Sequence, residues 1–101
     1  MFALADINVI EGNEEASEVE YFQSIQRAIN SGTAWSFQGS FGRTMMEAIE
    51  SGKCLLGLSS ARDYYGNRIP SRDEVKQGTK GSLDFVVQHS GQEFADLISN
   101  V

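Results

Sequence analysis

Residues 44–58 constrain the fold most, because this run holds a helix, the signal that ends it and an apolar segment. Apolar side chains recur at spacings of three and one from Met45 to Ile49, which places them on one face of a helix. Gly52 follows as a residue that readily adopts the left-handed conformation that closes helices. Residues 53–58 are then nearly all apolar, a pattern typical of a buried strand. The run therefore predicts a corner at which a helix turns into a strand.

The rest of the chain supplies further elements. Residues 14–29 carry apolar side chains at helical spacing, and Gly32 is placed to end that helix. Residues 2–10 are apolar enough for a first strand. The pair Gly66-Asn67 favours a tight hairpin turn between strand-forming residues.

Two more helices are predicted in the second half. Ser71 and Glu74 have the spacing of a capping box, so a short helix is expected to begin there and to end at Gly78. Residues 83–99 keep one helical phase, with Ser82 as the cap and a bend or break at Gly91. A short strand over residues 85–87, followed by a shorter helix, is the alternative.

These elements predict an α+β fold with two to three helices packed on a small, mostly antiparallel sheet. The sheet is expected to contain residues 2–10, residues 53–58 and the hairpin. The 101 residues suffice for one compact domain, 1–101. The predicted core consists of Val19, Phe22, Ile25, Ile29, Met45, Ile49, Leu55, Leu56, Val86, Phe94 and Leu97.

The charge and the cysteine content restrict the compartment and the partners. Cys54 is the one cysteine, so no intramolecular disulfide can form, and a reducing, cytoplasmic setting is expected. No apolar stretch is long enough for a signal peptide or a membrane span. The net charge of −6 disfavours nucleic-acid binding, although arginines and tyrosines lie close together in residues 62–72.

Residues 39–44 form the candidate ligand site. Two glycines, an arginine and two hydroxyl residues stand directly before a helix, an arrangement that can hold a phosphate or a carboxylate. Plain helix capping by Ser40 is the competing interpretation. The run lacks the spacing and the lysine of a nucleotide-hydrolysing phosphate loop. The candidate residues are Gly39, Ser40, Gly42, Arg43 and Thr44.

Two segments are candidate partner-binding surfaces. The first is acidic and contains Glu14, Glu15 and Glu18 in a stretch of 20 residues without lysine or arginine. The solvated start of a helix is the simpler interpretation of these glutamates. The second is the hairpin region. It contributes Tyr64, Tyr65, Arg68 and Arg72. The aromatic residues Trp35, Phe37 and Phe41 could either anchor the core or line a pocket, and exposed aromatic surface would also allow a homodimer.

The residues supply little for catalysis. One histidine, His89, and one cysteine lie in separate predicted elements and form no nucleophile motif. No metal-ligand spacing is present. We therefore expect no enzymatic activity, no cofactor and no metal site.

Residues 21–82 resemble small accessory proteins carried by bacterial plasmids and phages. The resemblance rests on the segments Tyr21-Phe22-Gln23-Ser24-Ile25-Gln26, Gly39-Ser40-Phe41-Gly42-Arg43 and Arg62-Asp63-Tyr64-Tyr65-Gly66-Asn67-Arg68-Ile69-Pro70-Ser71-Arg72. It implies a mobile-element protein that binds and inhibits or modulates a host protein, such as a defence component. The alternative is a small-ligand domain that binds a nucleotide or another phosphate through residues 39–44.

Overall fold

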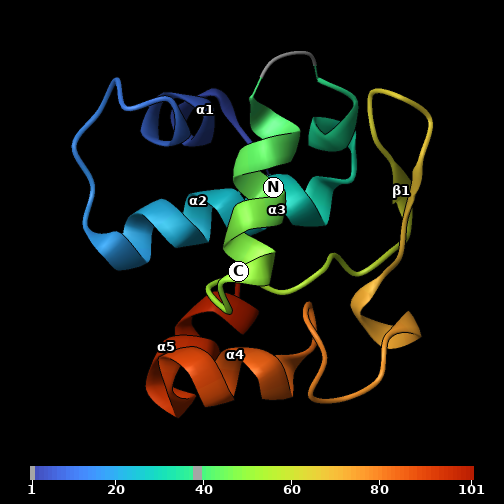
Figure 1. The fold of residues 1–101 in the computed structure, drawn as a ribbon. Helices are drawn as coiled ribbons and strands as arrows, with labels where there is room; N and C mark the ends of the chain where they lie inside the picture. Colours follow the sequence, from blue (N-terminus) through green and yellow to red (C-terminus); the bar gives the residue numbers. More distant parts are fainter. Residues whose placement is uncertain (1, 38–39) are drawn as a thin grey trace.

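The computed structural model describes residues 2–37 and 40–101. Short helices dominate the fold, and a two-stranded antiparallel sheet accompanies them (Figure 1). In chain order the elements are α1 (Leu4–Ile10), α2 (Glu18–Ser31), the 3-10 helix η1 (Thr33–Ser36), α3 (Phe41–Glu50), β1 (Ala61–Arg62), β2 (Arg68–Ile69), the 3-10 helix η2 (Arg72–Glu74), α4 (Leu83–Ser90) and α5 (Gln92–Ser99).

Helix α2 lies at the centre of the arrangement and contacts α1, α3 and α5. Helix α3 crosses it, the α4–α5 pair lies below, and the hairpin of β1 and β2 stands at the opposite side from the α1–α2 loop (Figure 1). The C-terminal end of α2 follows the predicted signal at Gly32, whereas the helix begins at Glu18, after the cap Ser17, and not at residue 14 as predicted. Ser17 Oγ accepts from the Glu20 amide at 3.1 Å, and Gly32 closes the helix at φ 74°.

The prediction of a strand over residues 2–10 is wrong, because most of this segment forms α1. The Asp6 carboxylate accepts from the Ala3 amide at 3.1 Å, which caps the first turn. Its other oxygen accepts from Ser24 Oγ at 3.0 Å and from Arg27 Nε at 2.9 Å, both on α2. The buried, paired carboxylate fixes α1 against α2, and residues 2–10 have no alternation to support a strand instead.

The strand predicted over residues 53–58 is also absent from the described structure. The segment is buried, but side chains and single backbone contacts satisfy its backbone in place of a neighbouring strand. The Leu56 amide donates to the Gly81 carbonyl at 3.0 Å, and the Gly57 carbonyl accepts from the Arg72 amide at 2.9 Å. Gln26 Oε1 accepts from the Leu55 amide at 2.8 Å, and Gln26 Nε2 donates to the Leu55 carbonyl at 3.0 Å. The Leu56 carbonyl accepts from Arg72 Nε at 2.9 Å. A side-chain amide can thus replace a strand partner for a buried backbone.

The corner at Gly52 has the predicted geometry and an additional tertiary role. Gly52 adopts φ 77°, and a Cβ built there would lie 2.5 Å from the Cβ of His89 on α4. Ser90 Oγ also donates to the Gly52 carbonyl at 2.8 Å. The missing side chain therefore lets the end of α3 dock against α4.

A hairpin around Gly66-Asn67 is confirmed, with Ala61 paired to Ile69 and Arg62 to Arg68, but its connection spans residues 63–67 and includes Tyr64 and Tyr65, so the predicted two-residue turn is wrong. It is the whole sheet of the described chain, so the fold is mostly helical, with more than the predicted two to three helices. After it, the Glu74 carboxylate accepts from the Ser71 amide at 2.8 Å, as predicted, but the helix ends at once as η2 rather than near Gly78.

The C-terminal segment breaks at Gly91, where φ 91° and ψ 159° interrupt the helix between α4 and α5. Ser82 Oγ caps α4 by accepting from the Phe85 amide at 3.2 Å. Residues 85–87 are helical, which rules out the alternative strand. The break turns α5 back so that it can pack on α2.

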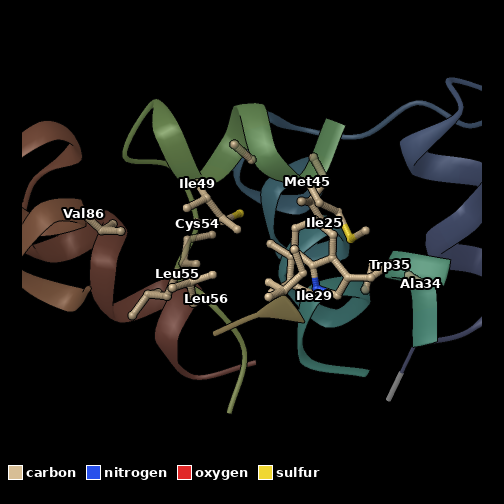
Figure 2. Packing of buried hydrophobic residues seen from close by; sticks show 14 of the residues in the cluster. Ile25, Ile29, Ala34, Trp35, Met45, Ile49, Cys54, Leu55, Leu56 and Val86 are labelled. Atoms are coloured by element: carbon tan, nitrogen blue, oxygen red, sulfur yellow. The ribbon is translucent and has the colours of Figure 1, made fainter. Parts of the chain in front are cut away.

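The core lies between α2, α3 and the C-terminal helices (Figure 2). The predicted members Ile25, Ile29, Met45, Ile49, Leu55, Leu56 and Val86 are buried. Val19, Phe22 and Phe94 are half-buried at the margin, and Leu97 is wrongly predicted because its side chain is 43% exposed. Trp35, expected either in the core or in a pocket, and Cys54, within the apolar run 53–58, are also core residues.

Candidate functional site

A cleft of about 580 Å³ lies between α3 and the hairpin. Three parts of the chain form it: the end of η1 with the residue after it, the first half of α3, and the hairpin with its turn. Its lining residues are Trp35, Phe37, Gly42, Arg43, Met46, Asp63, Tyr64, Tyr65 and Ile69.

The cleft has a rigid base and an exposed aromatic rim. Trp35, only 3% exposed, and Ile69 belong to the core and contribute the base (Figure 2 shows Trp35). Tyr65 is 84% exposed, and its ring stands nearly perpendicular to that of Tyr64, with centroids 5.2 Å apart. Phe37 is held by Phe41, whose ring meets it edge-on at 5.5 Å. These rings offer an amphipathic surface above a fixed support.

The turn that presents the tyrosines is held by Asp63. Its Oδ1 accepts from the amides of Tyr65 at 2.9 Å and Asn67 at 2.8 Å, and its Oδ2 accepts from the Asn67 side chain at 3.2 Å. Desolvation opposes the effect, but these hydrogen bonds keep the pKa of Asp63 below its ordinary value. The negative charge of Asp63 is thus engaged within the turn.

Arg43 is the cation of the cleft. It extends from the first turn of α3, three residues before Met46, so both side chains share one helix face. Among the described residues it is the one arginine for which no carboxylate or carbonyl partner is found. The other four have partners: Arg27 with Asp6, Arg62 with the Gly66 carbonyl, Arg68 with Glu74, and Arg72 with the Leu56 carbonyl.

The residues of the predicted ligand site, 39–44, do not all line one cavity. Gly39 lies outside the described residues. Ser40 occupies the N-cap position of α3, but its side chain makes no capping bond to the described chain. Gly42 and Arg43 line the cleft, whereas Thr44 lines a different hollow, beside Phe22.

The predicted hairpin surface is divided as well. Tyr64 and Tyr65 line the cleft. Arg68 forms an ion pair with Glu74 outside it. Arg72 is half-buried, donates to the Leu56 carbonyl and to Asn30 Oδ1 at 3.2 Å, and therefore holds the fold together.

The acidic segment forms a separate surface at the other side of the molecule from the hairpin (Figure 1). Glu14, Glu15 and Glu18 are exposed around a shallow hollow at the start of α2. Glu18 accepts from Lys53 Nζ at 3.1 Å, which ties part of its charge to the fold. The two predicted partner surfaces are therefore not continuous.

The one cysteine and the one histidine of the sequence, Cys54 and His89, make contacts within the fold. Cys54 is buried, and burial raises the pKa of its thiol, which donates to the Phe22 carbonyl at 3.4 Å. The His89 ring stacks on Phe85 at 4.0 Å. Within residues 2–37 and 40–101, no three His, Cys, Asp or Glu residues are grouped to hold a metal ion.

The sequence did not predict Met46 and Ile69 as lining residues, nor that α3 and the hairpin would face each other across a cleft. Trp35 was recognised as a core or pocket residue and serves as both. Met46 and Ile69 have ordinary apolar patterns, so nothing local marks them as lining residues. One signal was available: Arg43 and Met46 are three positions apart, which predicts that they share a helix face and so line the same wall of the cleft.

Comparison with known proteins does not extend this description: no protein-family model, curated protein or solved structure matches the chain significantly. In the described residues, no helix has the length and apolar character needed to cross a membrane.

Proposed function

We propose that this protein is a non-enzymatic binding protein that holds a partner protein at the cleft between α3 and the hairpin. The observation that carries the proposal is the meeting of two separately predicted regions in one place. Arg43 from α3 and the tyrosines from the hairpin turn face the same cleft. The resemblance to accessory proteins of mobile elements adds a host protein as the expected partner and inhibition or modulation as the expected effect.

The composition of the rim supports protein recognition. Tryptophan, tyrosine and arginine dominate the binding energy of protein interfaces, because each combines a large contact area with a polar group. Tyr64, Tyr65 and Arg43 bring two of these residue types together around one hollow, above the buried Trp35. Tyr65 is the member with the most surface to bury on contact, at 84% exposure.

Capture of a partner from bacterial lysate tests the proposal with matched variants. Tyr65→Ser removes the exposed ring of the rim, and Leu4→Ser removes another largely exposed apolar side chain, 72% exposed, from α1. We expect Tyr65→Ser to lose the captured protein and Leu4→Ser to retain it. A third variant reverses Glu14, Glu15 and Glu18 to lysine. Loss of capture in that variant alone would move the contact to the acidic segment.

A nucleotide or phosphate ligand at residues 39–44 is the second candidate function, and the unpaired guanidinium of Arg43 in the described chain favours it. A ligand at 100 times its dissociation constant stabilises the folded state by about 2.7 kcal/mol. A thermal-shift panel of nucleotides should therefore show one clear rise, which Arg43→Ala abolishes. A flat panel would remove this candidate.

A further inference from the structure

We infer that the cleft recognises an aromatic side chain next to a carboxylate on a segment of the partner protein. This inference rests on the proposed function and names the chemistry that the cleft selects. Three observations carry it: the arrangement of the rings, the unbalanced charge and the size of the hollow.

Aromatic rings from two parts of the chain line the cleft, where a further ring can contact them. Tyr64 and Tyr65 stand edge to face with each other, and Phe37 is paired with Phe41 at 81° between ring planes. Phe2 also contacts Phe37, with centroids 6.1 Å apart, so Phe37 is supported from behind. Edge-to-face and offset contacts extend readily to a further ring, because each ring offers a positive edge and a negative face.

The charge of the cleft selects for one negative group. Arg43 and Asp63 are the two charged residues in the lining. Asp63 accepts three hydrogen bonds from its own turn, whereas Arg43 has no partner in the described chain. Arg43 also stands in the first turn of α3, where the helix dipole favours an anion.

A single guanidinium matches a single carboxylate. Its fork of donors binds the two oxygens of a carboxylate side by side. Among the described residues that line the cleft there is no lysine and no second arginine, so the additional cations that would balance a di- or triphosphate are missing from this lining. The volume of about 580 Å³ lies within the range of ordinary ligand pockets and suits one ring system with a short acidic arm.

Three probes with the same ring and different charges test this selectivity on the full chain. Indole-3-acetate is an anion, indole-3-acetamide is its neutral analogue and tryptamine is a cation. Titrations followed by amide NMR shifts give the affinities and locate the contact. We expect shifts at residues of the cleft and binding of the acetate about tenfold tighter than the acetamide, because a charged partner strengthens the hydrogen bonds of Arg43. Tryptamine should bind most weakly.

Two variants that remove one positive charge each separate a local from a global effect. Arg43→Gln should bring the acetate to within about twofold of the acetamide. Lys76→Gln removes the same charge from an exposed position outside the cleft and should leave the tenfold preference intact. Circular dichroism confirms that both variants fold.

The outcomes distinguish the inference from the proposed function. Equal binding of acetate and acetamide, or tightest binding of tryptamine, overturns the charge selectivity while the cleft stands as a binding site. Failure of all three probes to shift any cleft residue overturns the inference. The proposed function falls only if the Tyr65→Ser variant also captures the partner as well as the unaltered protein does.

Discussion

Replacement of Gln26 by methionine is the sharpest test of how this fold holds its central segment. Gln26 is fully buried, and its amide forms both hydrogen bonds of the Leu55 backbone, at 2.8 and 3.0 Å. Methionine keeps the length and the helix propensity of the side chain, so little cavity forms. The Leu55 amide and carbonyl would remain buried without these partners.

The expected cost follows from two unsatisfied groups. Each buried donor or acceptor left without a partner costs about 1–3 kcal/mol, so Gln26→Met should lower the free energy of unfolding by roughly 2–6 kcal/mol. That is a large part of the 5–15 kcal/mol typical of a domain. Urea denaturation measures it as a lower midpoint with an unchanged slope.

Gln23 provides the matched control, because it lies one turn earlier on the same helix. Its side chain donates one hydrogen bond, to the exposed Leu97 carbonyl at 3.1 Å. Gln23→Met should cost about 0.5–1.5 kcal/mol, since water can replace that bond. Equal losses in the two variants would refute the reasoning that Gln26 substitutes for a strand partner.

Two further predictions concern titrating groups. The Ser71 amide and the Arg68 guanidinium lower the pKa of Glu74 to about 2, so its stabilisation is complete above its ordinary value of 4.5 and disappears as the pH falls towards 2. Urea midpoints of Glu74→Gln should therefore lie below those of the unaltered protein at pH 6 and converge with them near pH 2; a constant difference contradicts this. Cys54, with its raised thiol pKa, should react with a thiol reagent only after unfolding, and fast labelling of the native protein would place the thiol at the surface.

Local signals predicted the parts of the fold that depend on neighbours in the chain. The end of α2 at Gly32, the closure of α3 at Gly52, the hairpin and the break at Gly91 follow from glycines within a few positions. Such signals act over one turn and require no tertiary partner. They are sufficient to begin and end elements but not to assemble them.

The failed predictions depend on partners far along the chain. Residues 4–10 become a helix whose buried Asp6 is paired with Arg27, 21 positions away. Residues 53–58 remain outside the sheet, and their backbone is satisfied from distant positions: Gln26, 29 positions before Leu55, bonds to the Leu55 backbone, and Gly81 and Arg72 bond to Leu56 and Gly57. The pattern of residues within each segment does not indicate a hydrogen-bonding partner that lies far along the chain. The strand predictions therefore rested on apolar composition alone.

In the candidate site, too, the residue types could be recognised from the sequence, but their spatial arrangement could not. Arg43 and the two tyrosines were recognised by residue type, as a ligand contact and a partner contact. Their meeting depends on β1 contacting η1, and on Ile69 reaching the core beside the cleft. Arg72 was predicted to be a binding residue, yet its guanidinium donates a hydrogen bond to the Leu56 carbonyl within the fold. Surface and structural arginines are distinguished only by their tertiary partners.

Site-specific photo-crosslinking in a bacterial host tests the central claim most directly. A photoreactive phenylalanine analogue replaces Tyr65 at the rim of the cleft, Leu4 on α1 or Glu15 in the acidic segment, each in an otherwise unaltered chain. We predict one dominant crosslinked host protein from position 65 and none from positions 4 and 15. Crosslinking to that protein from position 15, with position 65 silent, would contradict the assignment of the cleft as the binding surface.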